Sequence, residues 1–490
     1  MTRSRSTRSA VFLAMVTAVT AGCTTTQATE RTAARSDVPA SFTELAADVQ
    51  HDIAVAWPHT AQVWPGADFS GHNLLLTDGT TTYAMDRDGR RKVSAEDLAR
   101  AKVEVPAEDA FDVATWHDKP SLIIHVPKDL GASQKPDPTG LTAPQPGNTF
   151  ALASHEQFHP YVQSKPQEWK SLKILDERSE GDRTELYPLQ AGPRVDRSMV
   201  YNTLLKGLRN PDEAAERLSE AAWWDAKWRK DYPDDASGQQ ATDLLEGTAK
   251  YFEQYTLGMT QVDDATDAGQ VREHLAKVLK PMTVASKGVE PYAIGTVALL
   301  NADAQGKDFK RKLTTEPTTP LAELLKGVKP SGAQRAPDEV REGIGKSVKS
   351  TNRELSKSID PFVKNVQDPG HSVLMLPVES VSGSMGGKGF YTTKELPITI
   401  TPDAKVTFKP AGGRLRAECV TTGELDKDGK GYFAIPLVPG KDGVTLKGTE
   451  LTLDGGGLSG RLSVRKATED DTYCAPNLAG VRRAGAGPGP

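Results

Sequence analysis

Residues 155–159 read His-Glu-Gln-Phe-His, which places two histidines four positions apart in a chain with only nine histidines among 490 residues. On a helix, residues four apart share one face, so His155 and His159 can direct their imidazoles at one metal ion. Glu156 is then placed to accept a proton from water beside that ion. The preceding Phe-Ala-Leu-Ala at 150–153 is apolar, as a buried helix requires. The simpler alternative is a surface helix with two ordinary histidines.

A third metal ligand has to come from elsewhere in the chain, and Glu246 is the preferred candidate. It lies in a helix-like stretch, Asp243 to Glu253, where its neighbours are apolar or small. A carboxylate buried there is costly unless it is paired or binds a metal. Gly247 would allow this helix to approach the histidine helix closely. Glu253, two turns further on the same face, is the alternative ligand or a partner for a histidine N–H, and Asp243 suits the first turn of the helix.

Pro160 follows the second histidine directly. Within a helix, proline removes one N–H donor and strains the preceding turn. We therefore expect the helix either to end at His159 or to bend there. Both histidines precede the break and can still converge.

The two segments His155-Glu-Gln-Phe-His159 and Glu246-Gly-Thr-Ala-Lys-Tyr251 together resemble those of the gluzincins, the zincin metallopeptidases with a glutamate ligand. The resemblance covers roughly residues 40–305 in layout. It implies a zinc ion (Zn²⁺) held by His155, His159 and Glu246, with Glu156 as general base. It also implies a small sheet against the active-site helix and a helical half that supplies the third ligand.

A peptidase also needs a donor for the oxyanion of the tetrahedral intermediate. Tyr292 follows a proline and begins a helix of small residues, which suits a phenol at the edge of a cleft. Tyr251 and, more weakly, His274 are alternatives. The competing interpretation of Tyr292 is a tyrosine of the hydrophobic core.

The N-terminus has the pattern of an export signal. Arg3, Arg5 and Arg8 precede a short apolar stretch at 10–19, far shorter than the roughly 20 residues needed to span a bilayer. Thr-Ala-Gly-Cys at 20–23 resembles a bacterial lipobox and predicts lipidation of Cys23, although a threonine stands where leucine is usual. The alternative is ordinary secretory cleavage. We thus expect a signal peptide at 1–22, a flexible tether at 23–40, and a protein anchored by lipid to the outer side of a bacterial membrane, or secreted.

The chain contains three cysteines, and export would place the remaining two in an oxidising compartment. Cys419 and Cys474 are therefore expected to form one disulfide, with two buried free thiols as the alternative. No cysteine is left for the metal, which agrees with a site made of histidine and glutamate.

The segments that must position these residues predict an α+β fold. Strand-like runs occur before residue 127 and helix-like runs from 150 to 303, and the chain becomes strand-rich again after 371. The expected organisation is a zincin-like catalytic domain at 41–330, a linker or peripheral helix at 331–370, a β-rich region at 371–480 and a disordered tail at 481–490. A net charge of −5 and the absence of a basic stripe or phosphate loop argue against nucleic acid as a partner.

The leading hypothesis is a zinc peptidase acting on polypeptides at the cell envelope. One alternative is a non-catalytic envelope lipoprotein that keeps a zincin fold as a binding module. Another is a zinc amidase that cleaves a non-peptide bond of the cell wall, because the same zinc-assisted attack by water serves any amide.

Overall fold

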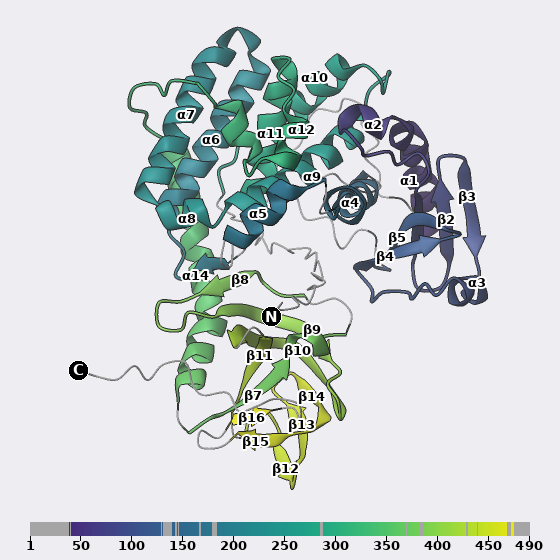
Figure 1. The fold of residues 1–490 in the computed structure, drawn as a ribbon, viewed down its shortest axis with the longest axis vertical. Helices are drawn as coiled ribbons and strands as arrows, with labels where there is room; N and C mark the ends of the chain where they lie inside the picture. Colours follow the sequence, from purple (N-terminus) through teal and green to yellow (C-terminus); the bar gives the residue numbers. More distant parts are fainter. Residues whose placement is uncertain are drawn as a thin grey trace, which may run out of the picture. The chain divides into compact units, whose positions relative to one another are not determined.

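The computed structural model of the chain contains two compact units (Figure 1). The first contains the described residues from 39 to 178 and from 189 to 350, and the second contains 184–188 and those from 351 onward. The residues that the structure describes are 39, 41–128, 130, 140–142, 145, 147–165, 168–178, 184–284, 288–368, 370–382, 386–427, 430–438, 440–467 and 472–474. The predicted signal peptide, Cys23 and the C-terminal tail lie outside these ranges, as does nearly all of the predicted tether. Within the described ranges, no helix combines the length and apolarity needed to cross a membrane.

The first unit opens with a long helix and a five-stranded sheet in the order β3-β2-β1-β5-β4 (Figure 1). The central pair, β1 and β5, is parallel, and the other neighbours are antiparallel. β1 is buried on both faces, since Leu74 and Leu76 join the main core while Leu75 joins a small cluster with Leu98 of α3. This two-sided burial explains its unbroken apolar run. The elements are α1 (Phe42–Ala56), η1 (Trp57–His59), α2 (Thr60–Val63), β1 (Asn73–Thr77), β2 (Thr82–Asp86), β3 (Gly89–Val93), α3 (Ala95–Arg100), β4 (Ala110–Trp116) and β5 (Lys119–His125).

A helical half follows and completes the core of the first unit (Figure 1). Two of its helices, α9 and α11, are buried along most of their length. The helices are α4 (Gly147–Phe158), η2 (His159–Gln163), α5 (Lys170–Arg178), α6 (Ala191–Arg209), η3 (Pro211–Glu213), α7 (Ala214–Asp231), α8 (Pro233–Ser237), α9 (Gln240–Met259), α10 (Ala268–Val278), α11 (Glu290–Ala304), α12 (Lys310–Thr315) and α13 (Pro320–Leu324).

A long helix, α14 (Asp338–Gln367), occupies most of the segment expected to be a linker or peripheral helix. Val340, Ile344 and Val348 are spaced four apart and belong to the core of the first unit. From Thr351 onward the helix belongs to the second unit.

The second unit is rich in strands, so the predicted α+β class with a β-rich C-terminal region is confirmed. Its main path of strands runs β12-β13-β14-β10-β11-β7-β16-β15. Off this path, β9 pairs with β10, β8 pairs with β9, and β6 pairs with β8. The elements are β6 (Thr184–Leu186), β7 (Ser372–Pro377), η4 (Val378–Ser380), β8 (Phe390–Thr392), β9 (Thr399–Phe408), β10 (Gly413–Lys427), β11 (Lys430–Leu437), β12 (Thr445–Lys447), β13 (Glu450–Gly455), β14 (Leu458–Ser463), β15 (Arg465–Ala467) and β16 (Thr472–Cys474).

The expected Cys419–Cys474 disulfide is wrong, because Cys419 is a free and exposed cysteine. Cys419 lies on β10 and Cys474 on β16, and β11 and β7 stand between these two strands. Adjacent strands are about 4.8 Å apart, so three steps separate the two strands by about 14 Å. A disulfide needs its Cα atoms within about 7 Å.

Candidate metal centre

The two histidines lie at the junction of an α-helix and a π-helical turn. His155 is in the last turn of α4, where Phe150, Ala153 and Phe158 are buried in the core. The α-helix ends at Phe158, and η2 continues as a π-helix. Pro160 lacks an N–H and so cannot donate to the preceding turn. The turn that follows is closed by an i→i+5 hydrogen bond from the Ser164 N–H to the His159 carbonyl, 2.8 Å long. The chain therefore bends into a wider turn at the proline.

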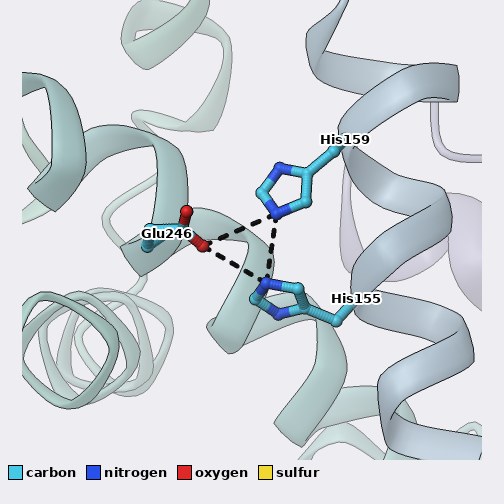
Figure 2. A group of neighbouring side chains, drawn as sticks. All are labelled: His155, His159 and Glu246. Atoms are coloured by element: carbon cyan, nitrogen blue, oxygen red, sulfur yellow. Dashed lines mark hydrogen bonds and ion pairs between the residues drawn. The ribbon is translucent and has the colours of Figure 1, made fainter. Parts of the chain in front are cut away.

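His155, His159 and Glu246 converge on one point, as predicted (Figure 2). The Nε2 atoms of the two histidines are 3.1 Å apart, and the Glu246 Oε2 lies 3.3 Å and 3.5 Å from those of His155 and His159. Ligands of a tetrahedral zinc ion, each about 2.0–2.1 Å from it, are about 3.4 Å from one another. Each of the three side chains is at most 8% exposed. This buried group can hold a metal ion.

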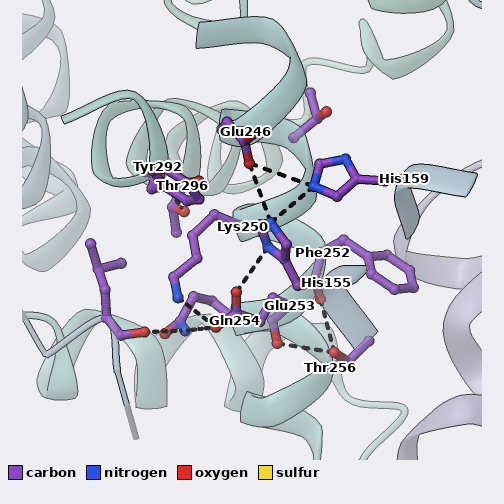
Figure 3. Close-up of polar contacts among 12 residues, drawn as sticks. His155, His159, Glu246, Lys250, Phe252, Glu253, Gln254, Thr256, Tyr292 and Thr296 are labelled. Carbon is purple, nitrogen blue, oxygen red and sulfur yellow. Dashed lines mark hydrogen bonds and ion pairs between the residues drawn. The ribbon is translucent and has the colours of Figure 1, made fainter. Parts of the chain in front are cut away.

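Glu253 occupies the opposite side of the His155 ring and is not one of the three converging ligands. Its Oε2 lies 3.0 Å from the His155 Nδ1, within ion-pair distance. The oxygen is not aligned with the ring N–H, so the contact does not count as a hydrogen bond. Its Oε1 accepts from the ammonium of Lys250 at 2.5 Å and from the amide of Gln254 at 3.2 Å (Figure 3). Of the two roles open from the sequence, partner of a histidine fits Glu253, and Glu246 is the ligand candidate.

Gln163 orients the second histidine and was not among the residues predicted from the sequence. Its Oε1 lies 2.6 Å from the His159 Nδ1, while its amide nitrogen donates to the Leu245 carbonyl and the Thr248 hydroxyl, both at 2.8 Å. Because the amide oxygen only accepts, His159 carries its proton on Nδ1 and presents the Nε2 lone pair to a metal. The available signal was a polar residue four positions after His159, which shares a face with that histidine only where the helix continues past the proline.

Glu156 is buried beside the two histidines, 8% exposed. Among the described residues, no protein group hydrogen-bonds to its carboxylate. Burial raises the pKa of Glu156, the charges of His155 and His159 oppose that rise, and those of Glu246 and Glu253 add to it. A carboxylate without a protein partner and with a raised pKa is suited to exchange a proton with water.

The same environment acts on His155 in the metal-free site. Burial lowers the pKa of His155, but its interactions with Glu246, Glu253 and Glu156 outweigh burial and raise that pKa to about 10. A proton on His155 thus balances part of the negative charge around the site. A metal ion must displace this proton in order to bind.

Of the candidate oxyanion donors, Tyr292 is the one beside the candidate metal ligands. Its ring stacks on that of His155 with a centroid separation of 5.7 Å and an angle of 21°, and it lies in the first turn of α11. Tyr251 is buried and donates to Asp303 at 2.5 Å, which commits its hydroxyl to another network. His274 lies half-buried on α10.

Gly247 has a different role from the one expected. It allows α9 to approach α11, whereas the prediction from the sequence was a close approach to the histidine helix. A Cβ at Gly247 would meet the Gly295 Cα at 3.0 Å, and one at Gly295 would meet the Gly247 Cα at 2.3 Å. The paired glycines therefore bring the backbones of the Glu246 helix and the Tyr292 helix into direct contact.

Comparisons with family models, with curated proteins and with solved structures found no match for this chain. The chemistry assigned to this site therefore depends on its own residues and their geometry.

Proposed function

We propose that the protein is a zinc-dependent metallopeptidase with His155, His159 and Glu246 as its ligands. The observation that carries the proposal is the separation of 3.1–3.5 Å among their Nε2 and Oε2 atoms, which matches the edges of a tetrahedral zinc site. Two histidines and one carboxylate leave one position open, as in catalytic zinc sites. The resemblance to the gluzincins in these segments supports the same assignment.

The charge of the buried groups favours a divalent cation. Glu156, Glu246 and Glu253 are each at most 8% exposed, and the ammonium of Lys250 contacts Glu253 at 2.5 Å. With both histidines neutral, as a metal requires, and the carboxylates ionised, these three glutamates and one ammonium carry two excess negative charges. A buried excess of this size is costly without a counter-charge, and Zn²⁺ would neutralise it.

The residues of the chain divide the proposed reaction among themselves. Zinc bound at this site supplies Lewis acidity toward water and toward the carbonyl of the scissile bond. Glu156 accepts a proton from the attacking water and returns it to the leaving amine. Gln163 and Glu253 hold the two imidazoles in orientation. Tyr292 is the proposed donor to the oxyanion, supported by its place beside His155.

The proposed substrate is a polypeptide at the cell envelope. The support for this location is the N-terminal sequence. Its lipobox-like segment at Cys23 favours a lipid anchor on the outer side of a bacterial membrane. No observation in the structure favours a non-peptide amide over a peptide bond.

Two variants test the proposal together. Glu156→Gln keeps the shape of the side chain and the three ligands, so we expect normal zinc content and no hydrolysis of a denatured protein substrate. Glu246→Ala should lose both zinc and hydrolysis. Zinc is measured by elemental analysis after dialysis, and hydrolysis by release of new amino termini. Undiminished hydrolysis by Glu156→Gln, or a zinc-loaded wild type that cleaves nothing in a diverse peptide library, would contradict the proposal.

A further inference from the structure

A fully buried arginine lies close to the proposed zinc site. Arg197 of α6 has no exposed surface, and its guanidinium stands over the ring of Trp228, 4.6 Å from the centroid. Two of its nitrogens donate to the two carboxylate oxygens of Asp243, at 2.9 Å and 2.5 Å. Its Nε is 3.5 Å from an oxygen of Glu290. Arg197 thus connects three helices through one planar, bidentate group.

A second arginine completes the network. Arg194, one turn earlier on α6, donates to the same Glu290 oxygen at 2.6 Å and also contacts Asp235 of α8. The indole N–H of Trp228 donates to Asp235 at 2.8 Å. Glu290 therefore keeps Arg194 as a partner when Arg197 is removed.

Both acidic partners of Arg197 lie on the helices that supply the site. Asp243 is three residues before Glu246 on α9, so the two share one face of that helix. Glu290 begins α11, two residues before Tyr292. We propose that Arg197 is a positioning residue that sets α9 and α11 so that Glu246 reaches the two histidines and Tyr292 stacks on His155. This inference rests on the proposed zinc site.

The geometry distinguishes positioning from stabilisation alone. A buried ion pair contributes little net stability compared with apolar residues of similar volume, because burying both charges costs as much as their attraction returns. A bidentate pair nevertheless fixes direction and distance, which apolar contacts do not. Metal affinity is sensitive to such placement, since ligand distances tolerate only about 0.2 Å.

The test replaces the pair by apolar residues instead of breaking it. In the double variant Arg197→Met with Asp243→Leu, no charge is left unpaired, because Glu290 retains Arg194. We expect the metal-free double variant to unfold at nearly the wild-type denaturant midpoint. Its zinc dissociation constant, measured by chelator competition, should rise about tenfold, and kcat on a peptide substrate should fall with little change in KM.

The matched control is Arg217→Gln, which removes an arginine of α7 that contacts Glu213 of η3 and Glu220 of α7. Neither glutamate lies on a helix that carries a proposed ligand. This variant should leave the zinc dissociation constant unchanged.

A folded double variant that binds zinc as the wild type does would overturn the positioning role. Should the double variant fail to fold, Arg197→Lys decides. It retains the charge without the planar fork, so weaker zinc binding supports the role and wild-type binding overturns it. A wild type that binds zinc but hydrolyses nothing would count against the proposed function alone.

Discussion

The contact between Gly247 and Gly295 yields the sharpest prediction, because Gly247 directly follows Glu246, the proposed third ligand. A methyl group on Gly295 would lie 2.3 Å from the Gly247 Cα and 2.8 Å from its carbonyl oxygen. Carbon atoms settle about 3.5–4.0 Å apart, so Gly295→Ala forces α9 and α11 apart by about 1 Å. Glu246 precedes Gly247 and moves with α9. A displacement of that size is several times the tolerance of about 0.2 Å for a zinc–ligand distance.

The change in stability should be small enough for the variant to fold, so that its zinc affinity can be measured. Overpacking costs about 1–3 kcal/mol, and replacing glycine by alanine inside a helix returns about 1 kcal/mol. We therefore expect Gly295→Ala to remain folded, with a loss of up to about 2 kcal/mol in denaturant unfolding of the metal-free protein. Its zinc affinity, measured by chelator competition, should fall tenfold or more.

The matched control is Gly345→Ala in α14, where an added methyl group meets nothing within 4 Å. Alanine has the higher helix propensity, so the free energy of unfolding of this variant should rise by about 1 kcal/mol. Its zinc affinity should not change. Wild-type zinc affinity in Gly295→Ala would refute the reasoning that the helix contact sets the ligand position.

Further predictions concern the ligands, the metal and the free thiol. Gln163→Ala leaves the His159 tautomer unfixed, so chelator competition should show zinc affinity reduced about 10–100-fold; an unchanged affinity would mean that Gln163 is not needed to orient the ring. Because the metal-free pKa of His155 is raised to about 10, zinc binding at pH 7 should release about one proton, seen as a calorimetric enthalpy that depends on the buffer, and apparent affinity should weaken as pH falls. Removing zinc should lower the melting temperature, and zinc at 1,000 times its dissociation constant should restore about 4 kcal/mol; equal melting temperatures with and without zinc would argue against a native metal site. Cys419→Ser should leave unfolding unchanged in oxidising buffer and remove one rapidly labelled thiol, whereas marked destabilisation would indicate that Cys419 forms a disulfide in solution.

The part of the site that lies on one helix could be predicted from the sequence. His155 and His159 converge because residues four apart share a helix face, which is a local property of the backbone. Glu246 could be ranked first because its neighbours are small and apolar. The choice between Glu246 and Glu253 stayed open, because both lie on the same face of α9. Only the offset between α4 and α9 decides which carboxylate meets Nε2 and which meets Nδ1.

The features that the sequence did not reveal depend on contacts distant along the chain. The order of strands in the second unit places β11 and β7 between Cys419 and Cys474, and no local pattern encodes that order. β6 is only three residues long, yet it pairs with β8, far away in the chain. The partner of Gly247 was also misassigned, because a glycine signals close approach without naming the helix that approaches.

Gln163 shows how local and distant constraints meet in this site. Its oxygen orients His159, and its nitrogen binds the carbonyl of Leu245, the residue directly before Glu246. One side chain therefore couples the orientation of the second ligand to the position of the third. It reaches both partners from a π-helical turn, which ends with Gln163 and is widened at Pro160. Pro160, where the helix was expected to end or bend, thus belongs to the turn that carries Gln163. A proline directly after the second histidine, with glutamine three residues further on, is the sequence pattern by which this arrangement can be sought in other chains.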